Sequence, residues 1–564
     1  MRPSPGLLIR AFGALRFAHF ERACQDPRAS QARALARYTR LAHDTAFGRA
    51  HGLTPHETPE SFAAKVPIRD YEGFRPYVAR TMAGEPRVLA PDAPTWYVTT
   101  SGTTGEPKYI PVTPRWYGAL RRQLGLWLYG VARDHPGTFD GALLTIVSPA
   151  VEGHTAAGTP CGSMSGLTNQ RAPGWLRSHY AVPQALAWIA DHEARYAACL
   201  RLAMQRPLSL VMTPNPSTLL RLAAVLEAQA DTLLAALAAG TLGQPWPALM
   251  DLPGVDPDAV REALTTRLSP DPARARAIAA RASRAGRLLP AHVWPELRFI
   301  GTWLGGSVGL HAPRLRQAWG ETAAMRDLGL LASEGRLTVP LTDDTPVGPL
   351  DVLGNYYEFI PEDALDAPHP PVLGAHQLEV GARYYVILTS GNGLPRYDLH
   401  DVVEVRGHHH RTPCVAFLRK GRDMLSLTGE KLHVNQLLAA VAAASEAAGL
   451  GVRQCRLVGD AAAIAYDLLV EPWEPPGAAD ALPTFARVLD ARLAELNVEY
   501  ASKRASGRLP APRVCLMRPG WSEALTAVAL AAGVRDAQLK WKVLADAWDA
   551  TSPAWVAEVA GDAR

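Results

Sequence analysis

Residues 97–108 read Tyr97-Val98-Thr99-Thr100-Ser101-Gly102-Thr103-Thr104-Gly105-Glu106-Pro107-Lys108, a strand-like run that leads into a loop rich in hydroxyls and glycine. Glycines let the backbone approach a ligand closely, while N–H groups and hydroxyls donate hydrogen bonds to phosphate oxygens. Lys108 adds a positive charge. The loop does not fit the Walker A pattern G-x-x-x-x-G-K-[ST]. Taken alone, it predicts a phosphate-binding loop, with a flexible hairpin between two strands as the alternative.

Around this loop, short strand-like runs alternate with longer helical ones. Ala142–Val147 and Leu208–Met212 are apolar and short, and each is followed by a longer helical stretch. This alternation is typical of α/β proteins. Between about residues 350 and 405 the segments become closely spaced and β-like, with Gly, Pro, Asn and Asp turns between them, which predicts a small antiparallel sheet or barrel.

The chain is long enough for more than one domain, since it has 564 residues of which 48% are apolar. A polar segment at residues 419–423 precedes a new series of helices and strands. We therefore predict an α/β protein with a large N-terminal domain at residues 1–418, built from mixed sheets with packed helices and a small β-barrel-like part. A hinge at 419–423 and a smaller α+β C-terminal lid domain at 424–564 follow.

Charge and cysteine usage restrict the partners. Lys and Arg number 58 against 54 Asp and Glu, without a block of like charges, so we expect neither a nucleic-acid nor a membrane partner but a small diffusible substrate. The six cysteines form no C-x-x-C pair, and apolar runs stay well short of the roughly 18 residues of a membrane span. No signal peptide is evident, so the expected location is cytoplasmic.

Four further landmarks follow one another along the chain. They are Gly329-Leu330-Leu331-Ala332-Ser333-Glu334-Gly335, Tyr356-Tyr357-Glu358-Phe359-Ile360-Pro361, Gly393-Leu394-Pro395-Arg396-Tyr397-Asp398-Leu399-His400-Asp401-Val402 and Gln538-Leu539-Lys540. With the loop at 97–108, they make the chain resemble the adenylate-forming superfamily of acyl-CoA synthetases, adenylation domains and luciferases. It is most similar to the Gretchen Hagen family of acyl-acid amido synthetases.

The resemblance implies an ATP site, with ATP and Mg²⁺ as cofactors. Glu334 would hold the Mg²⁺, which prefers hard oxygen ligands, and Asp401 would accept hydrogen bonds from the ribose hydroxyls. A solvated loop glutamate and a surface turn aspartate are the respective alternatives. The implied ATP-binding residues are Thr100, Ser101, Gly102, Thr103, Thr104, Gly105, Lys108, Ser333, Glu334, Tyr356 and Asp401.

Two assignments within this set stay open. Tyr356 and Phe359 could pack against adenine or fill the core. Lys540 is the candidate catalytic lysine, whose charge would offset negative charge that grows at the α-phosphate in the transition state. Lys542 lies two residues further on and is the alternative.

The third landmark departs from the family pattern Tyr-Arg-x-Gly-Asp. Asp398 stands in place of the arginine and His400 in place of the glycine. A cation near the phosphates is then missing, and His400 would replace it only when protonated. Either adenylation is retained with altered geometry, or the register of this loop differs from the family's.

Two histidine-containing segments are candidate binding sites. Residues 148–169 resemble a family loop near the acyl and amine sites, which makes His154, Thr155 and Thr159 candidates for the acyl/amine pocket. His408-His409-His410 suggests a metal site, but three consecutive residues cannot all face one ion and no carboxylate pair supports them in the sequence. A solvated turn is the favoured interpretation there.

Together these features predict an acyl-adenylate-forming ligase. A carboxylic acid would react with Mg·ATP to give an acyl-adenylate, and an amine, by the resemblance an amino acid, would then take the acyl group to form an amide. Two alternatives remain: an acyl-CoA or carrier-protein ligase that makes a thioester, and a non-catalytic acyl- or nucleotide-binding relative. The sequence does not reveal which acid or which acceptor is used.

Overall fold

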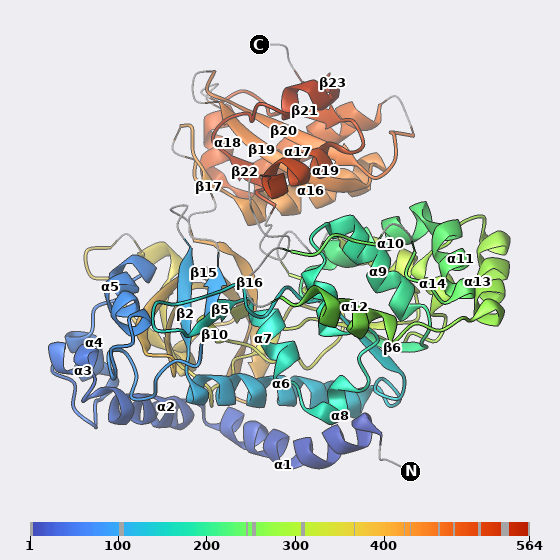
Figure 1. The fold of residues 1–564 in the computed structure, drawn as a ribbon. Helices are drawn as coiled ribbons and strands as arrows, with labels where there is room; N and C mark the ends of the chain where they lie inside the picture. The colour runs from blue at the N-terminus through green and yellow to red at the C-terminus, as the bar shows by residue number, and fades with distance from the viewer. Residues whose placement is uncertain are drawn as a thin grey trace. The chain divides into compact units, whose positions relative to one another are not determined.

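The fold was analysed in a computed structural model that describes residues 4–100, 107–243, 246–250, 255–305, 309, 311–365, 367–421, 424–428, 430–460, 463–477, 480–505, 509–531 and 541–561. The chain forms two compact units (Figure 1). The first comprises Met1–Val308 and Ala312–Phe417, and the second Gly309–His311 and Leu418–Arg564. The predicted α/β class with two-domain organisation is confirmed, whereas the hinge role of residues 419–423 stays a prediction.

The helices of the first unit surround its sheets (Figure 1). They are α1 (Pro5–Gln25), α2 (Pro27–Ala42), α3 (Ala46–Ala50), α4 (Pro59–Lys65), α5 (Tyr71–Met82), α6 (Pro114–Asp134), α7 (Met164–Gln170), α8 (Gly174–Arg177), α9 (His192–Ala203), α10 (Pro216–Ala228), α11 (Ala230–Ala239), α12 (Pro257–Thr265), α13 (Pro272–Ala285), α14 (Pro290–Val293) and α15 (Ala312–Trp319).

Capping residues fix where many of these helices begin. Thr113 precedes α6 and accepts a hydrogen bond from the Trp116 N–H, and Asp191 accepts one in the same way at α9. A proline occupies the first turn of α6, where its missing N–H costs nothing. α1 packs along α6, and Gly13 leaves the space that the Tyr129 ring fills.

A parallel sheet with strand order β3-β6-β7-β8 forms the core of one part of the first unit. Its strands are short and almost wholly apolar, as expected for strands covered by helices on both faces. Their bounds are β3 (Ala142–Thr145), β6 (Leu208–Met212), β7 (Phe299–Gly301) and β8 (Ala324–Arg326).

Two further sheets carry the strands on either side of the predicted phosphate loop and the second and third landmarks. A mixed sheet has the order β2-β1-β5-β4, and a larger one the order β11-β16-β15-β14-β12-β13; β9 and β10 form a separate hairpin. Closure of the larger sheet into a barrel stays a prediction. The bounds are β1 (Trp96–Thr100), β2 (Lys108–Val112), β4 (Gly153–His154), β5 (Pro160–Gly162), β9 (Leu331–Ala332), β10 (Gly335–Arg336), β11 (Gly348–Pro349), β12 (Tyr356–Pro361), β13 (Leu373–Gly374), β14 (Arg383–Ser390), β15 (Leu394–His409) and β16 (Thr412–Lys420).

The second unit has its own sheet and its own core, as an α+β arrangement requires. The sheet order is β22-β19-β20-β21-β23, and β17 pairs with β18. The elements are β17 (Met424–Leu425), β18 (Leu432–His433), α16 (Val434–Ala448), β19 (Val452–Asp460), β20 (Ala465–Pro472), α17 (Ala481–Leu496), α18 (Val498–Ala505), β21 (Arg513–Met517), α19 (Trp521–Ala531), β22 (Leu544–Ala545) and β23 (Val556–Ala560).

Within the described part of the chain, no single helix combines the length and the apolar composition of a membrane span. The pair α10 and α11 meets the criterion only when taken together, and the two helices are bent by 80° at the break between them.

Candidate active site

The predicted phosphate loop connects two paired strands. β1 and β2 are antiparallel, with Thr100 directly opposite Lys108. The loop between them, Ser101–Glu106, lies outside the described residues, so the predicted phosphate contacts of Ser101, Gly102, Thr103, Thr104 and Gly105 stay predictions. The Lys108 ammonium lies 5.6 Å from the centre of the Tyr71 ring, at the start of α5.

The start of α5 links β2 to the third landmark on β15. The Tyr71 hydroxyl accepts a hydrogen bond of 2.8 Å from the Tyr109 N–H on β2. Two residues earlier, Arg69 forms a parallel bridge with Tyr397, in which the Asp398 N–H donates to the Arg69 carbonyl at 2.8 Å. The phosphate-loop hairpin and the third landmark therefore belong to one hydrogen-bonded assembly.

Glu334 lies in the tight turn between β9 and β10, next to Ser333. Its backbone carbonyl accepts hydrogen bonds from the Trp116 indole at 2.9 Å and the Asn392 amide at 3.3 Å. Its carboxylate lies near the Tyr397 hydroxyl of the third landmark. Burial raises the pKa of Tyr397, and the nearby negative charge of Glu334 raises it further. The Ser-Glu-Gly turn thus meets the third landmark directly.

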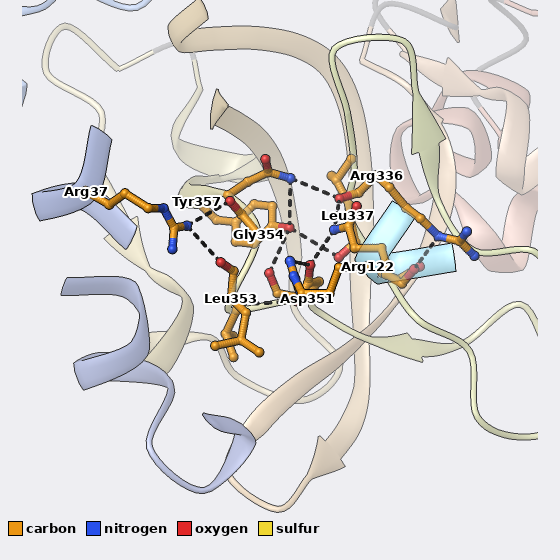
Figure 2. Close-up of polar contacts among 12 residues, drawn as sticks. Arg37, Arg122, Arg336, Leu337, Asp351, Leu353, Gly354 and Tyr357 are labelled. Carbon is orange, nitrogen blue, oxygen red and sulfur yellow. Dashed lines mark hydrogen bonds and ion pairs between the residues drawn. The ribbon is translucent and has the colours of Figure 1, made fainter. Parts of the chain in front are cut away.

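A buried polar network, which includes Tyr357 of the second landmark, supports the turn that carries Glu334 (Figure 2). Arg122 of α6 donates to both carboxylate oxygens of Asp351, at 2.7 and 3.1 Å. Gln123 donates to Asp351 and to the Arg336 carbonyl, and the Tyr357 hydroxyl donates to the Asp351 carbonyl at 3.3 Å. Burial lowers the pKa of Arg336 to about 10. Because every member is hydrogen-bonded, the network holds β10 against α6 in one geometry.

Asp327, at the carboxyl end of β8, is a residue that the sequence did not single out. Its carboxylate accepts hydrogen bonds of 2.6 Å from the N–H groups of Leu304 and Gly329, and burial raises its pKa to about 6. Trp127 of α6 donates to its carbonyl at 2.8 Å. Asp327 therefore ties the loop after β7 to the loop that leads to Glu334, at the sheet edge where α/β folds bind ligands. An acidic residue directly after a short apolar strand was the available signal.

The two departures in the third landmark are paired with each other. His400 has a backbone φ of 54°, in the left-handed region that favours glycine. Its N–H donates to an Asp398 carboxylate oxygen at 2.7 Å, and its ring Nδ1 lies 3.1 Å from the other oxygen. Glycine adopts a positive φ without strain, which explains the family's glycine at this position. In this chain, the hydrogen bond to Asp398 stabilises the strained backbone of His400.

This geometry predicts that His400→Gly is more stable than His400→Ala by about 1 kcal/mol, because an L-residue in the left-handed region costs about that much. Both variants lose the imidazole ring, so the difference between their free energies of unfolding reports the backbone conformation alone. The midpoint of urea unfolding measures it. His408 on the same strand is the control, since its φ is not positive and glycine there should be the less stable variant. Equal stability of the two His400 variants would contradict the strain.

Asp401 lies on β15 within an irregularity of the β14–β15 pairing. Tyr385 pairs with Val402 and Ile387 with Asp398, so three residues of β15 face one residue of β14. Such bulges re-aim side chains and occur often near active sites. Asp401 is buried, which disagrees with the alternative of a surface turn aspartate. Its contact with a ribose stays a prediction.

Tyr356 is buried on β12, with its ring 6.1 Å from that of Phe62 in an edge-on arrangement. This environment favours core packing over an adenine contact, which stays a prediction. Two residues along β12, buried Glu358 forms an ion pair with Arg396, at 3.0 and 3.1 Å from the guanidinium Nε. The second and third landmarks are therefore joined by a buried charge pair.

The candidate acyl and amine residues lie on the β4–β5 hairpin. β5 pairs with β1, so this hairpin shares a sheet with the strand that enters the phosphate loop. His154 is exposed. The Thr155 hydroxyl accepts a hydrogen bond of 3.1 Å from the Thr159 N–H, and the Thr155 N–H donates to the Thr159 carbonyl at 2.8 Å. Both threonines thus shape the turn, and their contact with a substrate stays a prediction.

Lys540 lies outside the described residues, but the chain directly after it is well anchored in the second unit. The Trp541 indole donates to the Cys455 carbonyl at 2.7 Å, and its ring lies 5.1 Å from that of Trp521. The alternative lysine, Lys542, has an exposed side chain on this anchored segment.

The similarity to known proteins extends over nearly the whole chain. Three family models match in succession: the GH3 family N-terminal domain over residues 16–324, the GH3 family central domain over 349–420 and the GH3 family C-terminal domain over 435–547. Among solved structures, the GH3.15 acyl acid amido synthetase has the same fold, with a TM-score of 0.80 at 19% identity over 96% of this chain and 95% of that chain.

Two relatives match this chain over most of its length. The chain is 25% identical over 547 residues to "Probable indole-3-acetic acid-amido synthetase GH3.2" of Oryza sativa subsp. japonica, which covers 91% of this chain and 87% of that protein. It is 26% identical over 422 residues to "Jasmonoyl--L-amino acid synthetase JAR6" of Nicotiana attenuata, covering 71% and 70%. Since the N-terminal family model alone spans more than half of the 564 residues, this chain belongs to the GH3 family.

Proposed function

We propose that this protein activates a carboxylic acid with ATP and transfers the acyl group to an amine, an amino acid, to form an amide. The observation that carries the proposal is the hydrogen bond from the side-chain amide of Asn392, the residue directly before the third landmark, to the Glu334 carbonyl. It brings the predicted Mg²⁺ ligand to the third landmark, which is also bridged to α5 next to Lys108. The names of the relatives as amido synthetases agree with this chemistry.

In the first step, a carboxylate oxygen of the acid forms a bond to the α-phosphorus of ATP, and the bond between that phosphorus and the bridging oxygen breaks to release pyrophosphate. Residues 101–105 and Lys108 would hold the phosphates, and Asp401 the ribose. Glu334 suits Mg²⁺ because its carboxylate is partly exposed and its backbone is fixed by Trp116. When bound with ATP, Mg²⁺ would neutralise phosphate charge. Lys540 would offset the charge that develops on the α-phosphate.

In the second step, the amine nitrogen attacks the acyl carbonyl carbon. A C–N bond forms, the bond from that carbon to the AMP oxygen breaks, AMP leaves and the nitrogen loses a proton. His154 and the turn of Thr155 and Thr159 are our candidates for contacts to the acyl group or the amine, because their hairpin is paired with β1. We further propose that the C-terminal unit moves about residues 419–423 between the steps.

Purified protein supplied with a panel of carboxylic acids should show acid-dependent ATP–pyrophosphate exchange. Adding amino acids should then release AMP and form an amide that mass spectrometry detects. Adding thiols in place of amino acids should not draw off the acyl group. Exchange with thiol-dependent product would overturn only the amide assignment. Absence of exchange with every acid would favour the non-catalytic alternative, which the Asp398 and His400 departures keep open.

A further inference from the structure

The sequence favours a solvated turn for His408-His409-His410, because no Cys or carboxylate pair supports a metal site there, but the structure places one carboxylate beside this segment. Glu21 of α1 reaches two of the three imidazoles. Its Oε1 lies 2.8 Å from Nε2 of His409, and its Oε2 lies 2.7 Å from Nε2 of His410. The three donor atoms all lie within 4.8 Å of one another. One carboxylate therefore lies beside two of the three imidazoles, a contact that the sequence alone does not indicate.

The backbone at His410 explains how two consecutive histidines face one carboxylate. On a regular strand, neighbouring side chains point to opposite faces. His409 ends β15, whereas His410 is in the turn to β16 with φ at 53°, in the left-handed region. This conformation costs an L-residue about 1 kcal/mol. Strained residues of this kind are concentrated at functional sites, so the outlier supports a role for the His410 ring.

The turn and the helix that carries Glu21 are fixed to each other. The Cys24 carbonyl near the end of α1 accepts hydrogen bonds of 3.1 Å from the Arg411 N–H and from the buried Thr412 hydroxyl. The Phe20 ring lies nearly parallel to the His409 ring at 6.4 Å. The donor atoms are thus held by a rigid frame and remain partly exposed, with side-chain exposures between 27% and 37%.

We propose that Glu21, His409 and His410 bind Zn²⁺ or a similar first-row transition-metal dication. Two imidazole nitrogens and one carboxylate oxygen form a donor set that suits such ions and leaves a fourth position for water. Ligands about 2.1 Å from a tetrahedral ion lie about 3.4 Å apart. The imidazole–carboxylate distances of 2.7 and 2.8 Å would lengthen on binding, and any donor pair near the 4.8 Å limit would shorten. None of these three residues is among those proposed to bind ATP.

The test is a titration of the metal-free full-length protein with Zn²⁺ in competition with a chromophoric chelator. We expect one saturable equivalent per chain and an increase in the midpoint of thermal unfolding. Glu21→Gln, His409→Ala and His410→Ala should each weaken binding at least about tenfold, since even residues that only support a metal ligand have effects of that size. His408→Ala is the matched control and should bind Zn²⁺ like the unmodified protein, because His408 is not one of the three donors.

His410→Gly separates loss of a ligand from loss of the fold. It removes an imidazole but suits the positive φ, so in the absence of metal it should be at least as stable as the unmodified protein. Loss of Zn²⁺ binding in this stable variant would support the site. The proposal is overturned if the unmodified protein shows no saturable equivalent, if His410→Gly binds normally, or if His408→Ala weakens binding as much as His409→Ala does.

Discussion

Replacing Lys540 with alanine is expected to slow acyl-adenylate formation by about 10²–10³-fold, the size of effect seen when one transition-state hydrogen-bond donor is removed. The lysine would contribute most at the moment when negative charge develops on the α-phosphate, so kcat should fall much more than the affinity for ATP. The measurement is the initial rate of acid-dependent ATP–pyrophosphate exchange at saturating acid and ATP.

Lys542→Ala is the matched control for this variant, since it removes a lysine two residues away on the same segment. The Lys542 side chain is exposed, whereas the neighbouring Trp541 and Val543 pack against the core of the second unit. We expect Lys542→Ala to keep nearly full exchange activity. If Lys542→Ala is the damaging change and Lys540→Ala is not, the assignment of the Gln-x-Lys element is off by two residues.

Glu358→Ala is expected to lower the free energy of unfolding of the N-terminal unit by about 3–5 kcal/mol, the usual cost of breaking a buried ion pair by removing one partner. Burial raises the pKa of Glu358, and Arg396 opposes this shift. Without Glu358, the buried Arg396 guanidinium would retain the carbonyls of Ala63 and Val66 as partners but no negative charge. Urea unfolding followed by tryptophan fluorescence measures the loss.

An exposed pair provides the control for this stability measurement. Arg75 and Glu72 form a bidentate ion pair on α5 with side chains 30% and 45% exposed, so Glu72→Ala should cost no more than about 1 kcal/mol. The double variant Glu358→Leu/Arg396→Met should recover much of the stability, because it leaves no unpaired charge. A Glu358→Ala variant that unfolds like Glu72→Ala would contradict the importance of the buried pair.

The sequence by itself determined the fold class, the family and the order of the candidate site segments. The apolar run at Leu208–Met212 is a strand of the parallel sheet, and Tyr97 to Thr100 do form the strand that enters the glycine-rich loop. These features follow from local rules: side-chain periodicity, β propensity and the turn preferences of glycine and proline. Residues that are close in the sequence carry this information, so it can be recognised without coordinates.

Only the tertiary structure decided which of those segments meet and what their side chains do. The Asn392 amide binds the Glu334 carbonyl across 58 positions of sequence, and Glu21 reaches His409 across 388. The positive φ of His400 likewise depends on where β15 is pinned by its neighbours. Each of these contacts is set by the packing of whole elements, and its free energy depends on burial and on partners that local sequence does not specify. For this reason the sequence could name the candidate residues, while their pairing had to come from the fold.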